Sequence, residues 1–473
     1  MQKQTPFWIF TASVLIALLL PALLQDGMFM DGMLYACISK NLSQGIGSFW
    51  FPHFSKTLYS FFDQQPPLGF WIQSLFFKLF GDSIYVERIY SFLTTLITAY
   101  LIILLWRMIF KNESEIKKLG WLPVLFWIII PVCFWSYSNN MLENTMGIFD
   151  LLAVICIVKY FQKQSVFFVL LSGIFICLAS LTKGFQGMFP LVALAAGWIV
   201  YRNVSFKKML LHSLLPVFVI CILCFLILQN DSAFKSLSAY LHNRVLNSIQ
   251  NAKDVTNRFY LLYRLFTELL PVLILGAIIT MIAKFRTKNG PFPILFFKKD
   301  FLFFLLIGFS ASLPLMITLE QRGFYLVTSF PYYAIALAIL VAPHISGWIE
   351  KTNTLRVGFR LFRIFSILAL AVVFAFSFLQ IGRTGRDADT IHDVKLIGGF
   401  VPSGTTLGST RELWEKWSLQ EYLVRHYYIC QADRISPEDH YLLLENENQN
   451  TSGIKIEKVN IATVKYHLYK VIR

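Results

Sequence analysis

Long apolar runs recur along almost the whole chain, and they constrain its fold more than any other feature. Several exceed the ~18 apolar residues that a bilayer-spanning helix requires, beginning with residues 7–25. Of the 473 residues, 56% are hydrophobic and 15% are charged, whereas about a quarter of the residues in soluble domains are charged. These values exclude an ordinary soluble protein, and we expect an all-α polytopic membrane protein.

The hydropathy pattern predicts about eleven spanning helices within residues 1–381. Their expected ranges are 7–25, 88–107, 119–137, 141–159, 166–182, 187–201, 210–229, 261–283, 301–318, 325–342 and 361–380. No small-residue cleavage site follows the first run, so it is expected to be a retained helix and not a removed signal peptide. The first outer loop, 26–87, is about sixty residues long, far longer than a simple return to the membrane requires.

Lysine and arginine are distributed unevenly between the two sets of loops. They gather near 107–118, 159–163, 202–208, 284–299 and 351–363, while the alternate short loops hold almost none. Because cytoplasmic loops are enriched in basic residues, we expect the first set and the N-terminus to be cytoplasmic. This asymmetry also accounts for the net charge of +15 without a nucleic-acid partner.

The tail at 382–473 is more polar than the rest of the chain. Residues 411–428 have helical spacing, whereas 440–445, 454–461 and 467–473 alternate like strands. We therefore expect a small extracytoplasmic α/β domain after the transmembrane part.

A carboxylate stands just beyond the first helix, at Asp31 in D-G-M-L-Y. An Asp before a short amphipathic helix, expected here to lie along the membrane surface, can serve as its N-cap. The same carboxylate could act as a general base toward a hydroxyl. The sequence leaves both interpretations open.

The expected fourth helix carries a polar stripe on an otherwise apolar surface. Asn140, Glu143, Asn144, Gly147 and Asp150 recur at helical spacing. Ionisable groups inside a bilayer are costly and usually face a cavity or a partner. Glu143 is expected on the same side of the membrane as Asp31, while for the deeper Asp150 a structural hydrogen bond between helices is an equal alternative.

Two isolated cations, Lys183 and Arg322, stand at outer helix ends. Snorkelling is the simplest interpretation of Lys183, but Gly184 and Gly187 would also let a phosphate approach the backbone. Arg322 is suited to bidentate binding of a phosphate. Two acids and two cations facing one outer cavity suit transfer from a lipid phosphate to a hydroxyl.

Five motifs in order resemble those of GT-C glycosyltransferases that use polyprenyl-phosphate sugars, most closely the lipid A aminoarabinose transferases and the protein O-mannosyltransferases. They are D-G-M-L-Y from Asp31, Q-Q-P-P-L-G-F-W from Gln64, N-N-M-L-E-N-T-M from Asn139, L-T-K-G-F from Leu181, and R-G-F-Y from Arg322 followed by Pro331. The resemblance covers most of the membrane part and does not extend past Gly382.

The resemblance implies inverting transfer of a sugar from a polyprenyl phosphate to a hydroxyl or phosphate acceptor on a lipid, glycan or protein, at the outer face of a bacterial inner membrane. It implies catalytic roles for Asp31 and Glu143, and donor-phosphate contacts from Lys183, Arg322 and Tyr325. It also implies a loop that contacts donor or acceptor, formed by Tyr35, Asp63, Gln64, Gln65, Pro66 and Pro67.

The chain departs from the family pattern at Gln64-Gln65, where relatives often carry Glu followed by a basic residue. Two neutral amides cannot replace those charges, so no cofactor is assigned; a divalent metal stays open, with Asp63 as a stand-in ligand. A lipid-linked sugar flippase, an O-antigen ligase-like enzyme and an inactive relative that serves as an interaction protein are the alternatives. Transporters often contain internal repeats, which this sequence lacks.

Overall fold

The computed structural model describes residues 3–250, 254–286, 299–446 and 453–472, and within them most long helices are apolar enough to span a membrane. Nine such helices occur in these ranges, or ten if the bent pair α6 (Trp121–Ile128) and α7 (Pro131–Ser138) counts as one span. The others are α1 (Thr5–Leu23), α4 (Val86–Ile109), α8 (Leu142–Lys163), α9 (Val166–Lys183) continued by η1 (Gly184–Val192) and α10 (Ala193–Tyr201), α11 (Phe206–Leu228), α14 (Tyr260–Arg286), α15 (Lys299–Ser312) with η4 (Leu313–Ile317), η5 (Gly323–Ser329) with α16 (Phe330–Lys351), and α17 (Val357–Phe378). The chain is therefore a multi-pass membrane protein, as its hydropathy predicted.

The count is lower than the expected eleven spans because 166–182 and 187–201 are counted together as one helical stretch, Val166–Tyr201; α9 and η1 with α10 lie where the two spans were expected. This stretch turns back on itself after α9. Gly184 has a φ of +84°, in the left-handed region that favours glycine. A Cβ on Gly187 would lie 2.7 Å from the carbonyl carbon of Ala179, so the returning chain packs directly on α9. The turn brings η1 to the end of α9, where Lys183 lies.

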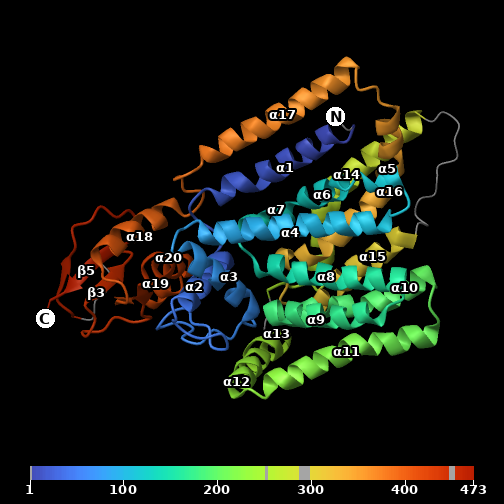
Figure 1. Cartoon of the computed structure of the whole chain (residues 1–473). Coiled ribbons are helices and arrows are strands. Elements are labelled where there is room, and N and C mark those ends of the chain that lie inside the picture. Colours follow the sequence, from blue (N-terminus) through green and yellow to red (C-terminus); the bar gives the residue numbers. More distant parts are fainter. Residues whose placement is uncertain (1–2, 251–253, 287–298, 447–452, 473) are drawn as a thin grey trace.

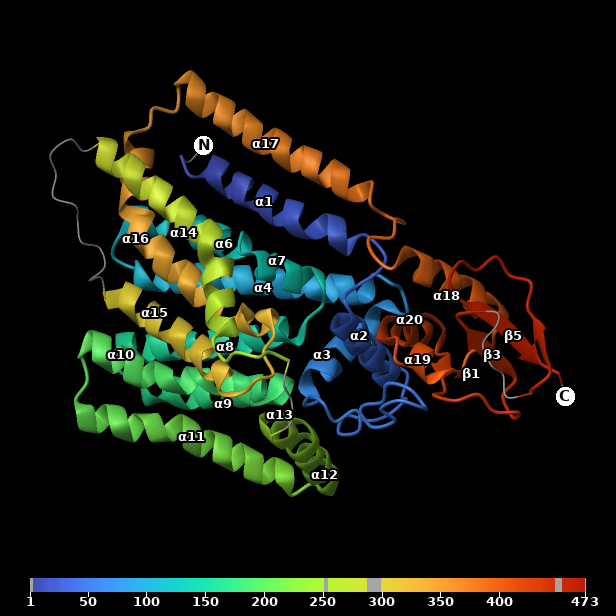
Figure 2. The same ribbon diagram turned by 180° about the vertical axis from the view of Figure 1, so that it is seen from behind.

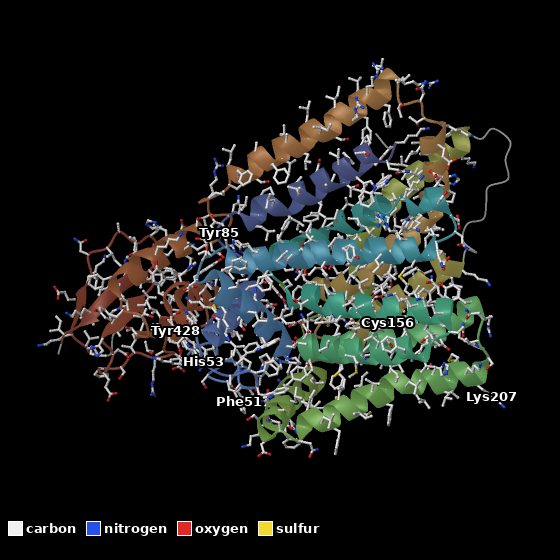
Figure 3. The ribbon with its side chains drawn as sticks, viewed as in Figure 1. Phe51, His53, Tyr85, Cys156, Lys207 and Tyr428 are labelled. Atoms are coloured by element: carbon white, nitrogen blue, oxygen red, sulfur yellow. The ribbon has the colours of Figure 1, made fainter. Side chains whose placement is uncertain are left out.

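The spanning helices lie side by side in one bundle. Figure 1 shows α17 along α1 on one side of the bundle and α11 on the opposite side, and Figure 2 shows α14, α15 and α16 from behind. The N-terminus and Lys207 lie at one end, whereas His53 and Tyr428 lie at the other (Figures 1 and 3). The basic loop expected at 284–299 falls almost wholly outside the described residues, while the short α5 (Ser114–Lys117) lies in another of the basic loops.

The first loop and the C-terminal segment together form an outer body at one end of the bundle (Figure 1). The loop contributes α2 (Met30–Ser43) and α3 (Leu68–Phe80), and the C-terminal segment contributes α18 (Ala388–Phe400), α19 (Arg411–Trp414), α20 (Trp417–Tyr427) and a sheet. The sheet has the order β2-β1-β3-β5-β4, formed by β1 (Thr406–Ser409), β2 (Cys430–Gln431), β3 (Tyr441–Leu444), β4 (Ile456–Lys458) and β5 (His467–Val471). β1 pairs in parallel with β2 and β3, while β5 pairs antiparallel with β3, placing Leu442 opposite Tyr469, and with β4. Helix and strands thus occur where the spacing of the tail predicted them.

Helix α2 is buried, and the prediction that it lies along the membrane surface is wrong. Every residue from Gly32 to Asn41 is buried, and Met33 and Ile38 share a hydrophobic core with Ile391 and Leu423 of the C-terminal segment. The sequence of the helix alone could not show this, because α3 covers one part of it and α20, more than 350 positions away, covers another.

Ion pairs fasten the C-terminal segment to the first loop and to α4, and the pair of Arg425 with Glu87 is buried on both sides. The guanidinium of Arg425 donates to Asp82 Oδ1 at 2.6 Å and to Glu87 Oε2 at 2.9 Å, and Lys395 Nζ lies 2.9 Å from Asp26 Oδ2. At the surface, His53 Nε2 lies 3.1 Å from the Tyr428 hydroxyl, and the two side chains are neighbours in Figure 3. The outer body is thus one packed unit.

Candidate functional site

A polar cavity of about 180 Å³ lies where the outer body meets the helix bundle. Six stretches of the chain that are distant in sequence supply its walls. The lining residues, called the polar cavity below, are Met30, Asp31, Leu34, Tyr35, Tyr59, Phe62, Gln64, Gln65, Lys183, Arg244, Phe324, Tyr325, Trp417 and Glu421. The structure therefore brings residues of four of the five motifs to one cavity.

Asp31 lies in the first turn of α2, and it is not the N-cap. The N-cap residue is Phe29, which makes no side-chain capping bond. The carboxylate of Asp31 still lies at the positive end of the helix dipole. A Cβ on Gly32 would overlap the carbonyl oxygen of Asn139, so glycine here lets α2 start directly against the turn before α8. Asn140 Nδ2 donates to Gly32 O at 3.0 Å and fixes this approach.

Burial raises the pKa of the Asp31 carboxyl, and the positive charges of Lys183, Arg322 and Arg244 oppose the rise. No hydrogen bond from another described residue reaches this carboxylate, so its oxygens are available to a ligand. A carboxylate whose pKa is raised toward neutrality is a stronger base at working pH than an ordinary Asp. Asp31 thus has both the access and the protonation behaviour of a general base.

Glu143 and Lys183 form a buried ion pair on the bundle side of the polar cavity. Lys183 Nζ contacts Glu143 Oε1, and the two side chains are 5% and 0% exposed. Lys183 is the last residue of α9 and lies 5.2 Å from the ring centroid of Tyr325 and 5.5 Å from that of Phe324. It therefore does not snorkel toward water, and Glu143 holds its ammonium at the cavity wall.

The second cation of the cavity is Arg244, which the sequence did not single out. It lies in η2 (Tyr240–Leu246), a π-helical segment that follows α12 (Asp231–Ala239) and precedes α13 (Asn247–Gln250). Its guanidinium contacts Glu320; burial acts to lower the pKa of Arg244, but the carboxylate of Glu320 raises it. Tyr325 donates its hydroxyl to the same Glu320 at 3.3 Å.

Arg322, expected to bind phosphate, is not among the residues that line the polar cavity. Its Nε lies 3.0 Å from Asp254 Oδ2, and its side chain is 55% exposed. Its charge still acts on Asp31. The structure thus places Arg244 on the wall where the sequence led us to expect Arg322.

The expected donor or acceptor loop divides between two neighbouring spaces. Tyr35, Gln64 and Gln65 line the polar cavity, whereas Pro66 lines a second pocket and Pro67 precedes α3 as its N-cap residue. The remaining member, Asp63, accepts hydrogen bonds from Gln64 Nε2 and Asn243 Nδ2, both at 2.6 Å. Asp63 therefore ties the loop to η2 and does not line the polar cavity.

The second pocket is an apolar groove of about 380 Å³ between α9, η1, α11 and α12. Its lining is almost entirely apolar and includes Met188, Ile220, Ile227 and Phe234. The groove lies near the polar cavity, because residues adjacent in sequence line the two: Pro66 follows Gln65, and Gly184 follows Lys183. Tyr240 of the groove also belongs to the same segment as Arg244.

In the parts of the chain that the structure describes, no three His, Cys, Asp or Glu side chains come together as a metal-binding group. The carboxyl groups that line the polar cavity are those of Asp31 and Glu421, and Gln64 and Gln65 add only neutral amides. The described residues therefore assign no divalent metal to this cavity. We derive no chemical step through a metal.

Comparison with known proteins identifies the fold. Residues 64–228 match the family model described as dolichyl-phosphate-mannose-protein mannosyltransferase. Over 208 residues the chain is 26% identical to the undecaprenyl phosphate-alpha-4-amino-4-deoxy-L-arabinose arabinosyl transferase of Wigglesworthia glossinidia brevipalpis. That match spans 42% of this chain and only 35% of the relative's length.

Similarity to solved structures extends over nearly the whole chain. The crystal structure of ArnT from Cupriavidus metallidurans bound to undecaprenyl phosphate has a TM-score of 0.62 at 13% identity and covers 97% of both chains. Its apo state gives 0.63, again at 13% identity, with 97% of this chain and 96% of that chain covered. The apo Archaeoglobus fulgidus oligosaccharyltransferase gives 0.56 at 12% identity, over 92% of this chain and 65% of that one. The chain thus has the GT-C fold of ArnT and of this oligosaccharyltransferase, and over residues 64–228 it resembles the dolichyl-phosphate-mannose-protein mannosyltransferases, as its motifs predicted.

Proposed function

We propose that the protein is a membrane glycosyltransferase that moves a sugar from a polyprenyl-phosphate donor to a hydroxyl or phosphate acceptor on a lipid, glycan or protein, with inversion. The observation that carries this proposal is the position of the apolar groove near a polar cavity that is lined by the two cations Lys183 and Arg244 and by the carboxylate of Asp31. The similar ArnT binds undecaprenyl phosphate, which has the same combination of a long hydrocarbon and a phosphate.

The proposed reaction follows from these positions. The polyprenyl chain lies in the apolar groove, and its phosphate lies between Lys183 and Arg244. Asp31 accepts the proton of an acceptor hydroxyl as that oxygen bonds to the anomeric carbon, on the side opposite the phosphate. The bond between this carbon and the phosphate oxygen breaks, and polyprenyl phosphate leaves with the electron pair. The two cations stabilise the charge that grows on the phosphate, while Glu143 positions Lys183.

Substitution of Asp31 by Asn tests the base. Asn keeps the size of the side chain but cannot take the proton, and general-base help is typically worth 10²–10⁴ in rate. We expect turnover to fall by about a hundredfold or more, while donor binding hardly changes. The measurement is release of free polyprenyl phosphate from a polyprenyl-phosphate sugar by the purified protein.

The matched control is Asp231→Asn, because Asp231 also lies in the first turn of an outer helix, α12, but is exposed and outside the cavity. Near-normal turnover is expected for it. Equal activity of the Asp31 and Asp231 variants would contradict the mechanism. A flippase, in contrast, would release no polyprenyl phosphate even as the wild type.

We further propose that the N-terminus is cytoplasmic and that the polar cavity opens at the outer face of the inner membrane. Support comes from the basic loops, because Lys207 and the N-terminus lie at the end of the bundle opposite the outer body (Figure 3) and basic loops favour the cytoplasm. A reporter fused after Arg473 should be active outside the cytoplasm, and one fused after Lys208 inside. A cytoplasmic signal from the Arg473 fusion would reverse the orientation.

A further inference from the structure

Helix α20 gives the C-terminal domain a direct part in the polar cavity. Trp417 and Glu421 are one helical turn apart, so they project from the same face, and both line the cavity. Other residues of α20 hold the helix in place: the Tyr422 hydroxyl donates to Met28 O at 3.2 Å, and Arg425 bonds to Asp82 and Glu87. The cavity-facing pair is thus carried by a firmly anchored helix.

One carboxyl oxygen of Glu421 is buried and has no hydrogen-bond partner in the part of the chain that the structure describes. The residue is 1% exposed, and its Oε1 has no hydrogen-bond partner among the described residues. A buried polar atom without a partner is costly, and native proteins rarely leave one so unless water or a ligand satisfies it. Since Glu421 lines the cavity, the missing partner is expected to come from a ligand.

Burial raises the pKa of Glu421 well above its usual range, and the negative charges of Asp31 and Asp387 add to the rise, while Arg386 opposes it. The rise favours the neutral carboxyl, which can donate one hydrogen bond as well as accept others. A group of this kind suits a sugar hydroxyl, which is both donor and acceptor.

Trp417 supplies the second component of the wall. Its ring is partly buried and lies 6.0 Å from that of Tyr59, with 31° between the planes. Aromatic faces carry negative electrostatic potential, so they attract the slightly positive C–H groups on one face of a sugar ring. An aromatic ring beside a hydrogen-bonding carboxyl matches the two kinds of surface that a sugar presents.

We propose that Trp417 and Glu421 form a wall that recognises the sugar of the donor, with the sugar ring stacked on Trp417 and one of its hydroxyls bonded to Glu421. This assignment rests on the proposed function. A phosphate bound by Lys183 and Arg244 brings the sugar attached to it into the rest of the same cavity, where this wall lies. The cavity volume of about 180 Å³ suits a single sugar ring and not a longer glycan.

The test compares the binding of two lipids. One is sugar-free undecaprenyl phosphate. The other carries a single mannose, glucose or 4-amino-4-deoxyarabinose, and the sugar is chosen as the one whose lipid the wild type binds most tightly. Glu421→Leu should weaken binding of the sugar-bearing lipid about tenfold and leave the sugar-free lipid unaffected. Glu421→Gln, which keeps a neutral donor and acceptor, should bind both lipids nearly as the wild type does. Trp417→Ala should resemble Glu421→Leu, with Trp417→Phe closer to the wild type.

Glu412→Leu, an exposed substitution in the same domain, is the control and should change neither affinity. If Glu421→Leu and Trp417→Ala weaken the binding of both lipids equally, the two residues have a structural role and the assignment is overturned. Unchanged binding of the sugar-bearing lipid would also overturn the assignment. If Glu421→Leu fails to fold, the Trp417 variants decide. A wild type that prefers the sugar-bearing lipid but releases no undecaprenyl phosphate would overturn the proposed transfer and leave the sugar-binding wall in place.

Discussion

Substitution of Glu143 by Gln should destabilise the protein, because it leaves the buried ammonium of Lys183 without its counter-charge. Removing one partner of a buried ion pair typically costs about 3–5 kcal/mol. The rings of Phe324 and Tyr325 near the ammonium offset about 1 kcal/mol of this. A loss of about 2–4 kcal/mol in the free energy of unfolding is therefore expected without ligand.

Undecaprenyl phosphate should restore part of this loss, since its phosphate would supply the missing negative charge. A ligand at a concentration of a hundred times its Kd raises the free energy of unfolding by about 2.7 kcal/mol. At the same lipid concentration, this increase should be larger in the Glu143→Gln variant than in the wild type. The measurement is thermal or denaturant unfolding in detergent, with and without the lipid.

Asp150 supplies a matched control two turns further along α8. It is fully buried, and neither carboxylate oxygen has a partner among the described residues, so the helix-to-helix hydrogen bond considered for it is absent there. Asp150→Asn leaves no cation unpaired and should be neutral or stabilising. The ion-pair reasoning is refuted if the Glu143→Gln variant is as stable as the wild type. It is also refuted if the lipid raises the stability of the variant no more than that of the wild type.

Two further predictions concern the attachment of the C-terminal domain. Burial lowers the pKa of His426 from 6.5 to about 4. Between these two pH values the unfolded chain binds a proton at this residue and the folded protein does not. The free energy of unfolding should therefore fall as the pH drops from about 6.5 to 4. His426→Gln should flatten that part of the pH profile, and an unchanged slope would contradict the assignment. Arg425→Met removes the nearer of the two cations beside the buried Glu87 and leaves Arg88 Nη1 at 3.9 Å. The change should cost up to about 3–5 kcal/mol, seen as faster proteolysis of the C-terminal domain; equal resistance to protease would show that other contacts hold it.

The sequence predicted the parts of this structure that leave a local signal. Hydropathy located the spanning helices, and unusual charges in apolar surroundings pointed to Asp31, Glu143 and Lys183, which the structure brings together around one cavity. No such signal distinguishes Arg244 from Arg322, because both are cations in outer loops. Which of them reaches the cavity depends on how η2 packs against the rest of the protein, a tertiary arrangement that the local sequence does not encode.

Trp417 and Glu421 were missed for a different reason. They lie nearly 390 residues after Asp31, in a segment whose spacing predicts an ordinary amphipathic helix. Their position in the cavity follows from the packing of α20 against α2, a tertiary contact that no local pattern encodes. The same contact explains why α2 is buried although its own sequence is typical of a surface helix.

The sharing of one core by the first and last segments of the chain has a consequence for biosynthesis. The ribosome adds about 5–20 residues per second, so Glu421 follows Tyr325 after roughly 5–20 s. When Tyr325 has been made, α16 and α17 are still to be synthesised, and the cavity lacks the wall that α20 supplies. A nascent chain can therefore not complete the cavity until α20 has been made and has packed against α2, so the order of synthesis makes assembly of the cavity a late step in folding.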